Sequence, residues 1–97
     1  MKKEEIRIGA VELLKALPES GSVSVHTAAE ITYDSKKGYQ ILLSSSALQI
    51  WMGFDDFTSR ISQTKRVVDY LESEKLSGRI IDARFGKKVV VKLRNAP

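Results

Sequence analysis

The sequence predicts an α+β fold, in which two helices pack on a mainly antiparallel sheet. Apolar residues recur every three or four positions near residues 4–17 and 57–75, which is the period of one helical face. Elsewhere apolar and polar residues alternate, as they do in strands with one buried face. A chain of 97 residues with no Cys has enough apolar residues for one core and is too short for two. We therefore expect a single domain over residues 1–97.

The first helix is predicted from Glu4 to Leu17, and Pro18 ends it because proline cannot continue a helix. Extended chain is predicted next, where apolar residues alternate with polar ones between Val23 and Asp34. The Asp34–Gly38 loop leads into a strand at 39–43, and a second loop at 44–46 leads into Leu48–Met52. The buried face of the first helix is predicted to comprise Ile6, Ala10, Leu13, Leu14 and Leu17.

A second helix is predicted after Gly53, running to about Lys75. Asp55 or Asp56 is expected to cap it, because a carboxylate accepts the free N–H groups of a helix start and matches its positive end. Two strands, Arg79–Phe85 and Lys88–Leu93, are predicted to close the domain as a hairpin. The buried face of this second helix is predicted to comprise Phe57, Ile61, Thr64, Val68 and Leu71, with Val67 beside them.

The chain carries a net charge of +4, and the excess of cations lies at its C-terminal end. Residues 1–59 hold 6 Lys and Arg against 8 Asp and Glu, whereas residues 60–97 hold 10 against 4. Such a basic region favours an acidic partner, which can be nucleic acid, anionic lipid or an acidic protein segment. A solvated surface is the plain alternative.

The residues that catalysis and metal binding require are sparse. His26 has Ser24 and Thr27 nearby, but the sequence around them has no nucleophile elbow and no activating base. Asp55 and Asp56 have no further oxygen ligands close in sequence, and the glycines form no phosphate-binding loop. Without Cys there is no thiolate nucleophile and no sulfur ligand for zinc. We expect no enzymatic activity, no cofactor and no metal.

The last predicted strand has the pattern of a sheet edge. Along this strand Val89, Val91 and Leu93 alternate with Lys88, Val90, Lys92 and Arg94. Lysines on a terminal strand prevent unwanted pairing. An edge of this kind can still accept a chosen peptide strand. The alternative is a basic nucleic-acid-binding domain in which Tyr39 and Phe85 stack on bases, although the chain lacks the aromatic-rich strand motif of such proteins.

The closing hairpin, Ile80–Leu93, resembles that of the FtsQ/DivIB family of bacterial cell-division proteins. The family pattern is an isoleucine, Asp, an apolar residue, Arg and an aromatic residue, followed by a turn and a Val-rich strand. Ala83 departs from it, since the family more often has Leu there. Three further segments agree in order and spacing: Leu13–Leu17 with the leading helix, Gly38–Leu43 with the central hairpin, and Met52–Phe57 followed by Arg60-Ile61 with the second helix start. The resemblance covers most of the chain.

The resemblance implies the last domain of a membrane-anchored protein. Members of the family have one membrane-spanning helix, a small polypeptide-transport-associated domain, and then a β domain outside the cytoplasmic membrane. Only that β domain would be present here. The implied function is a non-enzymatic scaffold of the bacterial divisome during septum formation. The implied partners are FtsB and FtsL, with FtsB adding a strand to the last strand of the domain. No nucleic-acid partner is implied, and we expect the isolated domain to be monomeric.

The resemblance and the edge-strand argument select the same residues. Arg84 is implied to pair with a partner carboxylate, Phe85 to pack on an apolar partner side chain, and Lys37 to supply a second cation. The predicted partner-binding residues are Lys37, Arg84, Phe85, Lys88, Val89, Val90, Val91, Lys92 and Leu93.

Overall fold

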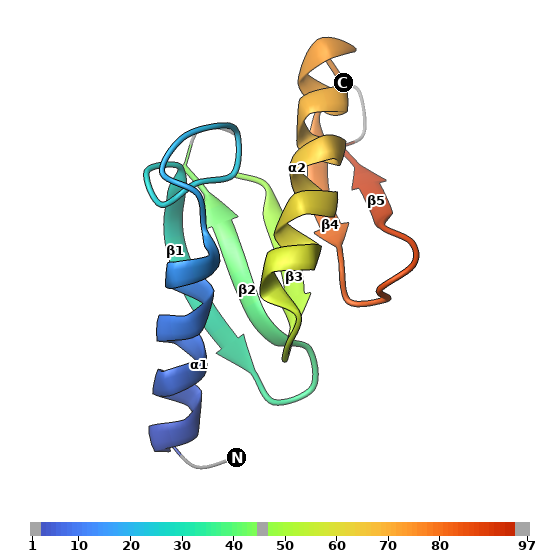
Figure 1. Cartoon of the computed structure of the whole chain (residues 1–97). Coiled ribbons are helices and arrows are strands. Elements are labelled where there is room, and N and C mark those ends of the chain that lie inside the picture. The colour runs from blue at the N-terminus through green and yellow to red at the C-terminus, as the bar shows by residue number, and fades with distance from the viewer. Residues whose placement is uncertain (1–2, 45–46, 95–97) are drawn as a thin grey trace.

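A computed structural model describes residues 3–44 and 47–94 and confirms the α+β fold (Figure 1). Of the loop predicted at 44–46, residues 45–46 lie outside the described residues. The elements in chain order are α1 (Lys3–Ala16), β1 (Ala28–Asp34), β2 (Gly38–Leu43), β3 (Gln49–Gly53), α2 (Phe57–Ser73), β4 (Gly78–Asp82) and β5 (Val90–Leu93).

The strands form one sheet in the order β1-β2-β3-β4-β5. Neighbouring strands are antiparallel except β3 and β4, which are parallel. This parallel pair exists because α2 crosses over the sheet and returns the chain to the end where β3 began. Within the described residues, β1 and β5 are therefore the two edges of the sheet.

Both helices lie on one face of the sheet, and the core is between these two layers (Figure 1). Leu13 of α1, Ile41 of β2 and Ile81 of β4 are fully buried there. The predicted inner face of α2 is confirmed, because Phe57, Ile61, Thr64, Val68 and Leu71 are its buried residues.

The other face of the sheet carries no helix among the described residues, and two rows of side chains run straight across it. Alternation along each strand places these rows opposite the core residues. One row is Thr32, Gln40, Trp51, Asp82 and Val90. The second row is Glu30, Leu42, Gln49, Ile80 and Lys92. We call this surface the open face.

The extended chain predicted from Val23 is wrong for its first part, because β1 begins only at Ala28. Ser24 and Thr27 bend the chain instead. The Ser24 Oγ accepts the N–H of Thr27 at 3.3 Å, and the Thr27 Oγ1 accepts the N–H of Ser24 at 2.9 Å. Such local bonds from hydroxyl groups compete with strand pairing. Val23 is nevertheless buried in the core, as an inward-facing apolar residue should be.

Two further predictions at helix ends and faces are wrong. Leu14 does not belong to the buried face of α1, since 45% of it is exposed. Neither Asp55 nor Asp56 caps α2 through its side chain: Asp56 is the N-cap residue, but its φ is 54° and its carboxylate makes no capping bond. The Asp55 carboxylate instead lies 3.2 Å from the guanidinium of Arg60.

The predicted closing strands are each shorter than expected. β4 ends at Asp82 rather than Phe85, and β5 begins at Val90 rather than Lys88. The Asp82 carboxylate accepts the backbone N–H of Arg84 at 3.1 Å, which turns the chain out of the sheet.

Gly9 lets α1 approach the sheet. The Tyr39 hydroxyl passes beside it and donates to the Ile6 carbonyl at 2.6 Å. A Cβ at residue 9 would overlap that hydroxyl and lie 2.7 Å from Tyr39 Cζ.

Gly9→Ala should therefore destabilise the domain by about 1–3 kcal/mol, although alanine favours helices. Urea unfolding measures this effect. Glu12→Ala, at an exposed position of the same helix, is the matched control and should change stability by less than about 0.5 kcal/mol. A Gly9→Ala variant more stable than the unsubstituted protein would contradict the packing of α1 on Tyr39.

Candidate partner-binding edge

The backbone of β5 presents hydrogen-bonding groups to solvent. Arg94, just after β5, donates its N–H to the Ser77 carbonyl at 2.8 Å, so the amide of residue 94 faces β4. In an antiparallel strand, successive amides point to opposite sides. The amides of Lys92 and Val90 therefore face β4, and those of Leu93 and Val91 face outward.

A second hydrogen bond gives the same result. Ala83, just after β4, donates its N–H to the Trp51 carbonyl at 2.9 Å and so faces β3. Because successive amides alternate in direction, the amide of Asp82 faces β5, where Asp82 is paired with Val90. The outward direction of the Val91 and Leu93 amides thus rests on two independent bonds.

A group of cations and rings lies at the end of the sheet where β5 begins. Lys37, Trp51, Arg84, Phe85 and Lys88 form this group, which we call the cation–aromatic cluster. The Lys37 ammonium lies 4.4 Å from the centre of the Trp51 ring, and the Arg84 guanidinium lies 5.0 Å from it. The Phe85 ring has the same guanidinium at 5.6 Å and the Lys88 ammonium at 5.4 Å. Cations at these distances are attracted to the ring faces.

Arg84 is held by a carboxylate of its own chain. Its Nε donates to Asp82 Oδ1 at 2.7 Å and its Nη2 to Asp82 Oδ2 at 2.6 Å. Burial raises the pKa of the Asp82 carboxyl, but the hydrogen bonds and the charge of Arg84 outweigh burial and hold that pKa below its ordinary value. This bidentate pair fixes the guanidinium in place, so a partner carboxylate would have to join Asp82 there or displace it.

Helix α2 braces the loop that carries the cluster. Arg60 Nη1 donates to the Ala83 carbonyl at 2.8 Å, and Gln63 Nε2 donates to the Gly86 carbonyl at 2.8 Å. The loop between β4 and β5 is thereby tied to the helix layer on both sides of Arg84 and Phe85. Such support holds exposed side chains in fixed positions for a partner.

The structure brings the predicted residues together. Lys37, Arg84, Phe85 and Lys88 meet in the cluster, and residues 89–93 follow from it along the edge. Phe85, Val90 and Leu93 are exposed, whereas Val89 and Val91 pack partly against the core. The side chains of these last two valines therefore serve the fold, and Val91 can offer a partner only its backbone.

Sequence reasoning missed Trp51. It follows an alternating strand pattern and lies on the open face between Lys37 and Arg84. Its buried Nε1 has no hydrogen-bond acceptor among the described residues, which is unusual for a buried indole. A Trp at an outward position of an alternating strand is the signal that could have identified it.

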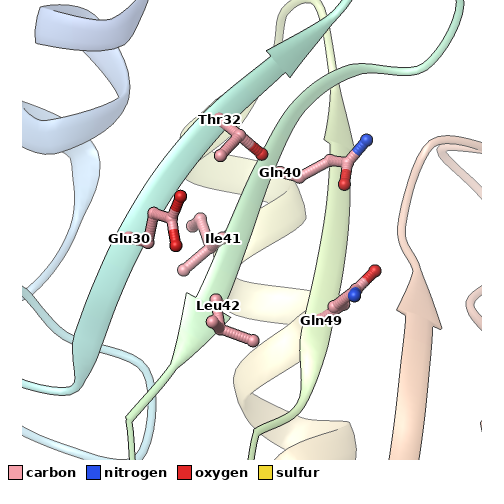
Figure 2. A pocket seen from close by; sticks show the side chains of 6 residues that line it. All are labelled: Glu30, Thr32, Gln40, Ile41, Leu42 and Gln49. Carbon is pink, nitrogen blue, oxygen red and sulfur yellow. The ribbon is translucent and has the colours of Figure 1, made fainter.

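Away from the cluster, the open face has a shallow recess of about 230 Å³. Figure 2 shows Glu30 and Thr32 of β1 standing beside Gln40 of β2 and Gln49 of β3. Glu30 is the one ionisable side chain among the residues that line it, so the recess lacks the paired acid and base of a catalytic site.

The other residues considered from the sequence are not brought into such a site. His26 is exposed, and its backbone N–H donates to Ser24 Oγ at 3.3 Å within the turn before β1. Over residues 3–44 and 47–94, no three His, Cys, Asp or Glu side chains gather as a metal site. Neither described helix has the length and apolar character needed to cross a membrane.

Comparisons with protein-family models, with curated proteins and with solved structures found no match to this chain.

Proposed function

We propose that this chain is a scaffold domain of the FtsQ/DivIB kind, which binds a partner by accepting a strand at β5. The observation that supports the proposal most directly is an exposed edge strand that starts beside a cation–aromatic cluster. Main-chain groups of Val91 and Leu93 face outward from this edge and are available to a peptide strand.

The character of the partner segment follows from the edge. Lys88 and Lys92 favour a segment with acidic residues, because complementary charge speeds and orders docking. Phe85, which is 51% exposed, offers a ring on which an apolar partner side chain can pack. An extended, acidic segment with an apolar anchor fits this edge.

On this proposal the partners are FtsB-like and FtsL-like division proteins. The domain would belong to a single-pass protein of the cytoplasmic membrane, would lie on its extracytoplasmic side, and would act in septum formation without enzymatic activity. Two observations support this proposal. One is the family resemblance, and the other is the cation–aromatic cluster, in which the residues that the resemblance implies for partner binding lie close together: Arg84, Phe85 and Lys37.

Binding of nucleic acid is the alternative that the same experiment tests. Tyr39, one of the two rings expected to stack on bases, is buried in the core. Lys37 and Arg84 already contact the Trp51 ring, so a base could stack there only by displacing a cation. A generic single strand that binds with an affinity falling steeply with salt would favour this alternative. A protein partner should instead bind while such a strand does not.

We expect Phe85→Ala to weaken binding of the extracytoplasmic segment of an FtsB-like protein by about tenfold or more, as loss of an aromatic anchor does. The measurement is a calorimetric titration with the synthetic segment, beside circular dichroism to check folding. Tyr70→Ala removes an exposed ring from α2, away from the edge, and should bind normally.

Arg84 needs a different variant, because Arg84→Ala alone would leave the buried Asp82 carboxylate unpaired. The double variant Asp82→Asn with Arg84→Gln removes the ion pair without that charge, and we expect weaker binding with folding retained. If this variant and Phe85→Ala both bind like the unsubstituted domain, the partner does not use the cation–aromatic cluster.

A further inference from the structure

The two edges of the sheet carry opposite charges. β1 contains Glu30 and Asp34 and has no Lys or Arg between Ala28 and Asp34. The last strand and its flanks contain Lys88 and Lys92 and no acid between residues 88 and 94. Both edges are open within the described residues. One copy of the chain therefore presents an acidic strand on one side and a basic strand on the other.

The strand directions allow these edges to pair between copies. With β3 and β4 parallel and the other neighbours antiparallel, β5 runs opposite to β1. Two copies in the same orientation would therefore place β5 of one antiparallel to β1 of the next. The helices of both copies would stay on the same face of the extended sheet (Figure 1).

The outward amides of β1 have the matching alternation. Leu43 donates its N–H to the Leu48 carbonyl at 2.9 Å and so faces β3. The amide of Leu42 then faces β1, because successive amides point to opposite sides. Leu42 is paired with Glu30, so the Glu30 amide points toward β2 and the Ile31 amide points away from the sheet. Ile31 and Val91 thus share two properties: each points its amide outward and its side chain toward the helix layer.

We propose that copies of this chain associate head to tail, with β5 of one copy pairing with β1 of the next and Val91 opposite Ile31. This single register sets Lys92 of β5 opposite Glu30 of β1. Figure 2 shows the Glu30 side chain on the open face. Lys92 belongs to the same row of paired residues, so these two side chains lie on the same side of the joined sheet. Opposite charges at facing positions stabilise strand pairs.

An apolar contact accompanies this register. A groove of about 260 Å³ runs beside β1, between it and α1. The same register brings Leu93, which is 46% exposed, over residue 29 at this groove. The contact would cover Leu14 and Val25, whose exposure the isolated domain leaves unexplained. The groove is lined by Leu14, Val25, Ala28, Ala29, Glu30 and Ile31.

This association departs from the monomer expected from the sequence. The contact is heterologous, so it leaves a free edge at each end and builds an open series rather than a closed dimer. Because β5 has only four residues, the contact is small and forms at high protein concentration. The inference does not rest on the proposed partner, although a strand bound at β5 would block it.

Sedimentation velocity tests the inference on the purified chain with no partner added. Between micromolar and millimolar protein the mean mass should rise past that of a dimer, and the rise should weaken with salt. Lys92→Glu or Glu30→Lys should lower the association constant roughly fivefold. The double variant should restore it, because the charges are exchanged. Arg66→Glu, the same charge change on the exposed side of α2, is the control.

Three results would overturn the inference: a monomer at every concentration, a discrete dimer unaffected by Lys92→Glu, or a double variant as weak as the single ones. The second result would indicate a contact between copies that does not use β5. Adding the FtsB-like segment in a separate run keeps the two proposals apart. A chain that stays monomeric yet binds the segment removes only the head-to-tail contact. A chain that associates at high concentration, but ignores the segment at low concentration where it is monomeric, removes only the proposed partner.

Discussion

Replacing Ile61 by Asp is expected to unfold the domain. Ile61 lies on the inner face of α2 and is 4% exposed, in contact with the core between the helices and the sheet. A carboxylate there would be buried in the apolar core, which costs several kcal/mol. A domain of this size has a total stability of only about 5–10 kcal/mol. Circular dichroism of Ile61→Asp should show no cooperative thermal transition.

The neighbouring residue supplies the control for this variant. Ser62 is exposed on the outer side of α2, so Ser62→Asp adds the same charge to the same turn of helix and should melt like the unsubstituted domain. If Ile61→Asp melted normally as well, the inner face of α2 would have been assigned to the wrong residues.

Helix α2 could be predicted because its signal is local and complete. Its buried positions repeat at helical spacing over more than four turns, so the apolar residues alone define one face. In α1 the same argument selects Leu14 wrongly. Apolar residues occur on more than one side of that helix, and periodicity cannot tell which side meets the sheet. The packing of Tyr39 past Gly9 decides this orientation, and that contact joins residues far apart in the sequence.

The closing hairpin was predicted too long for a different reason. Alternation continues through residues 83–85, but Asp82 uses its carboxylate to hold the Arg84 backbone and side chain. That local bond is stronger than the preference of the following residues for a strand, since it pairs two charges at hydrogen-bond distance. The residues after Asp82 therefore form a loop, and the loop is what makes Phe85 available to a partner.

The candidate edge could be predicted in part. The charge pattern and the terminal position of the last strand identify β5 as an edge, and the structure places Lys37 and Arg84 against the same Trp51 ring. Trp51, which joins these two cations, could not be found in the same way. It reaches Lys37 because β2 pairs with β3, and it reaches Arg84 because β3 and β4 are neighbours through a parallel crossover. The pairing of strands cannot be read from a local sequence pattern.

Proline at two adjacent positions of β5 should separate partner binding from folding. The Leu93 amide faces outward, so Leu93→Pro removes one donor from the edge while the pairing with β4 is retained, and prolines are tolerated on edges for this reason. The Lys92 amide faces β4, and Lys92→Pro removes a donor from the native hairpin instead. The two variants should therefore fail in different assays.

For Leu93→Pro we expect normal thermal melting and binding of the FtsB-like segment weakened by about tenfold, because a partner carbonyl is left without its donor. For Lys92→Pro we expect a lower melting temperature. Leu93→Ala distinguishes the lost amide from the lost side chain, since it keeps the N–H. If Leu93→Pro binds the segment as tightly as Leu93→Ala does, the partner makes no main-chain bond at this position, and strand addition to β5 is the wrong mode of binding even if the cation–aromatic cluster is the right site.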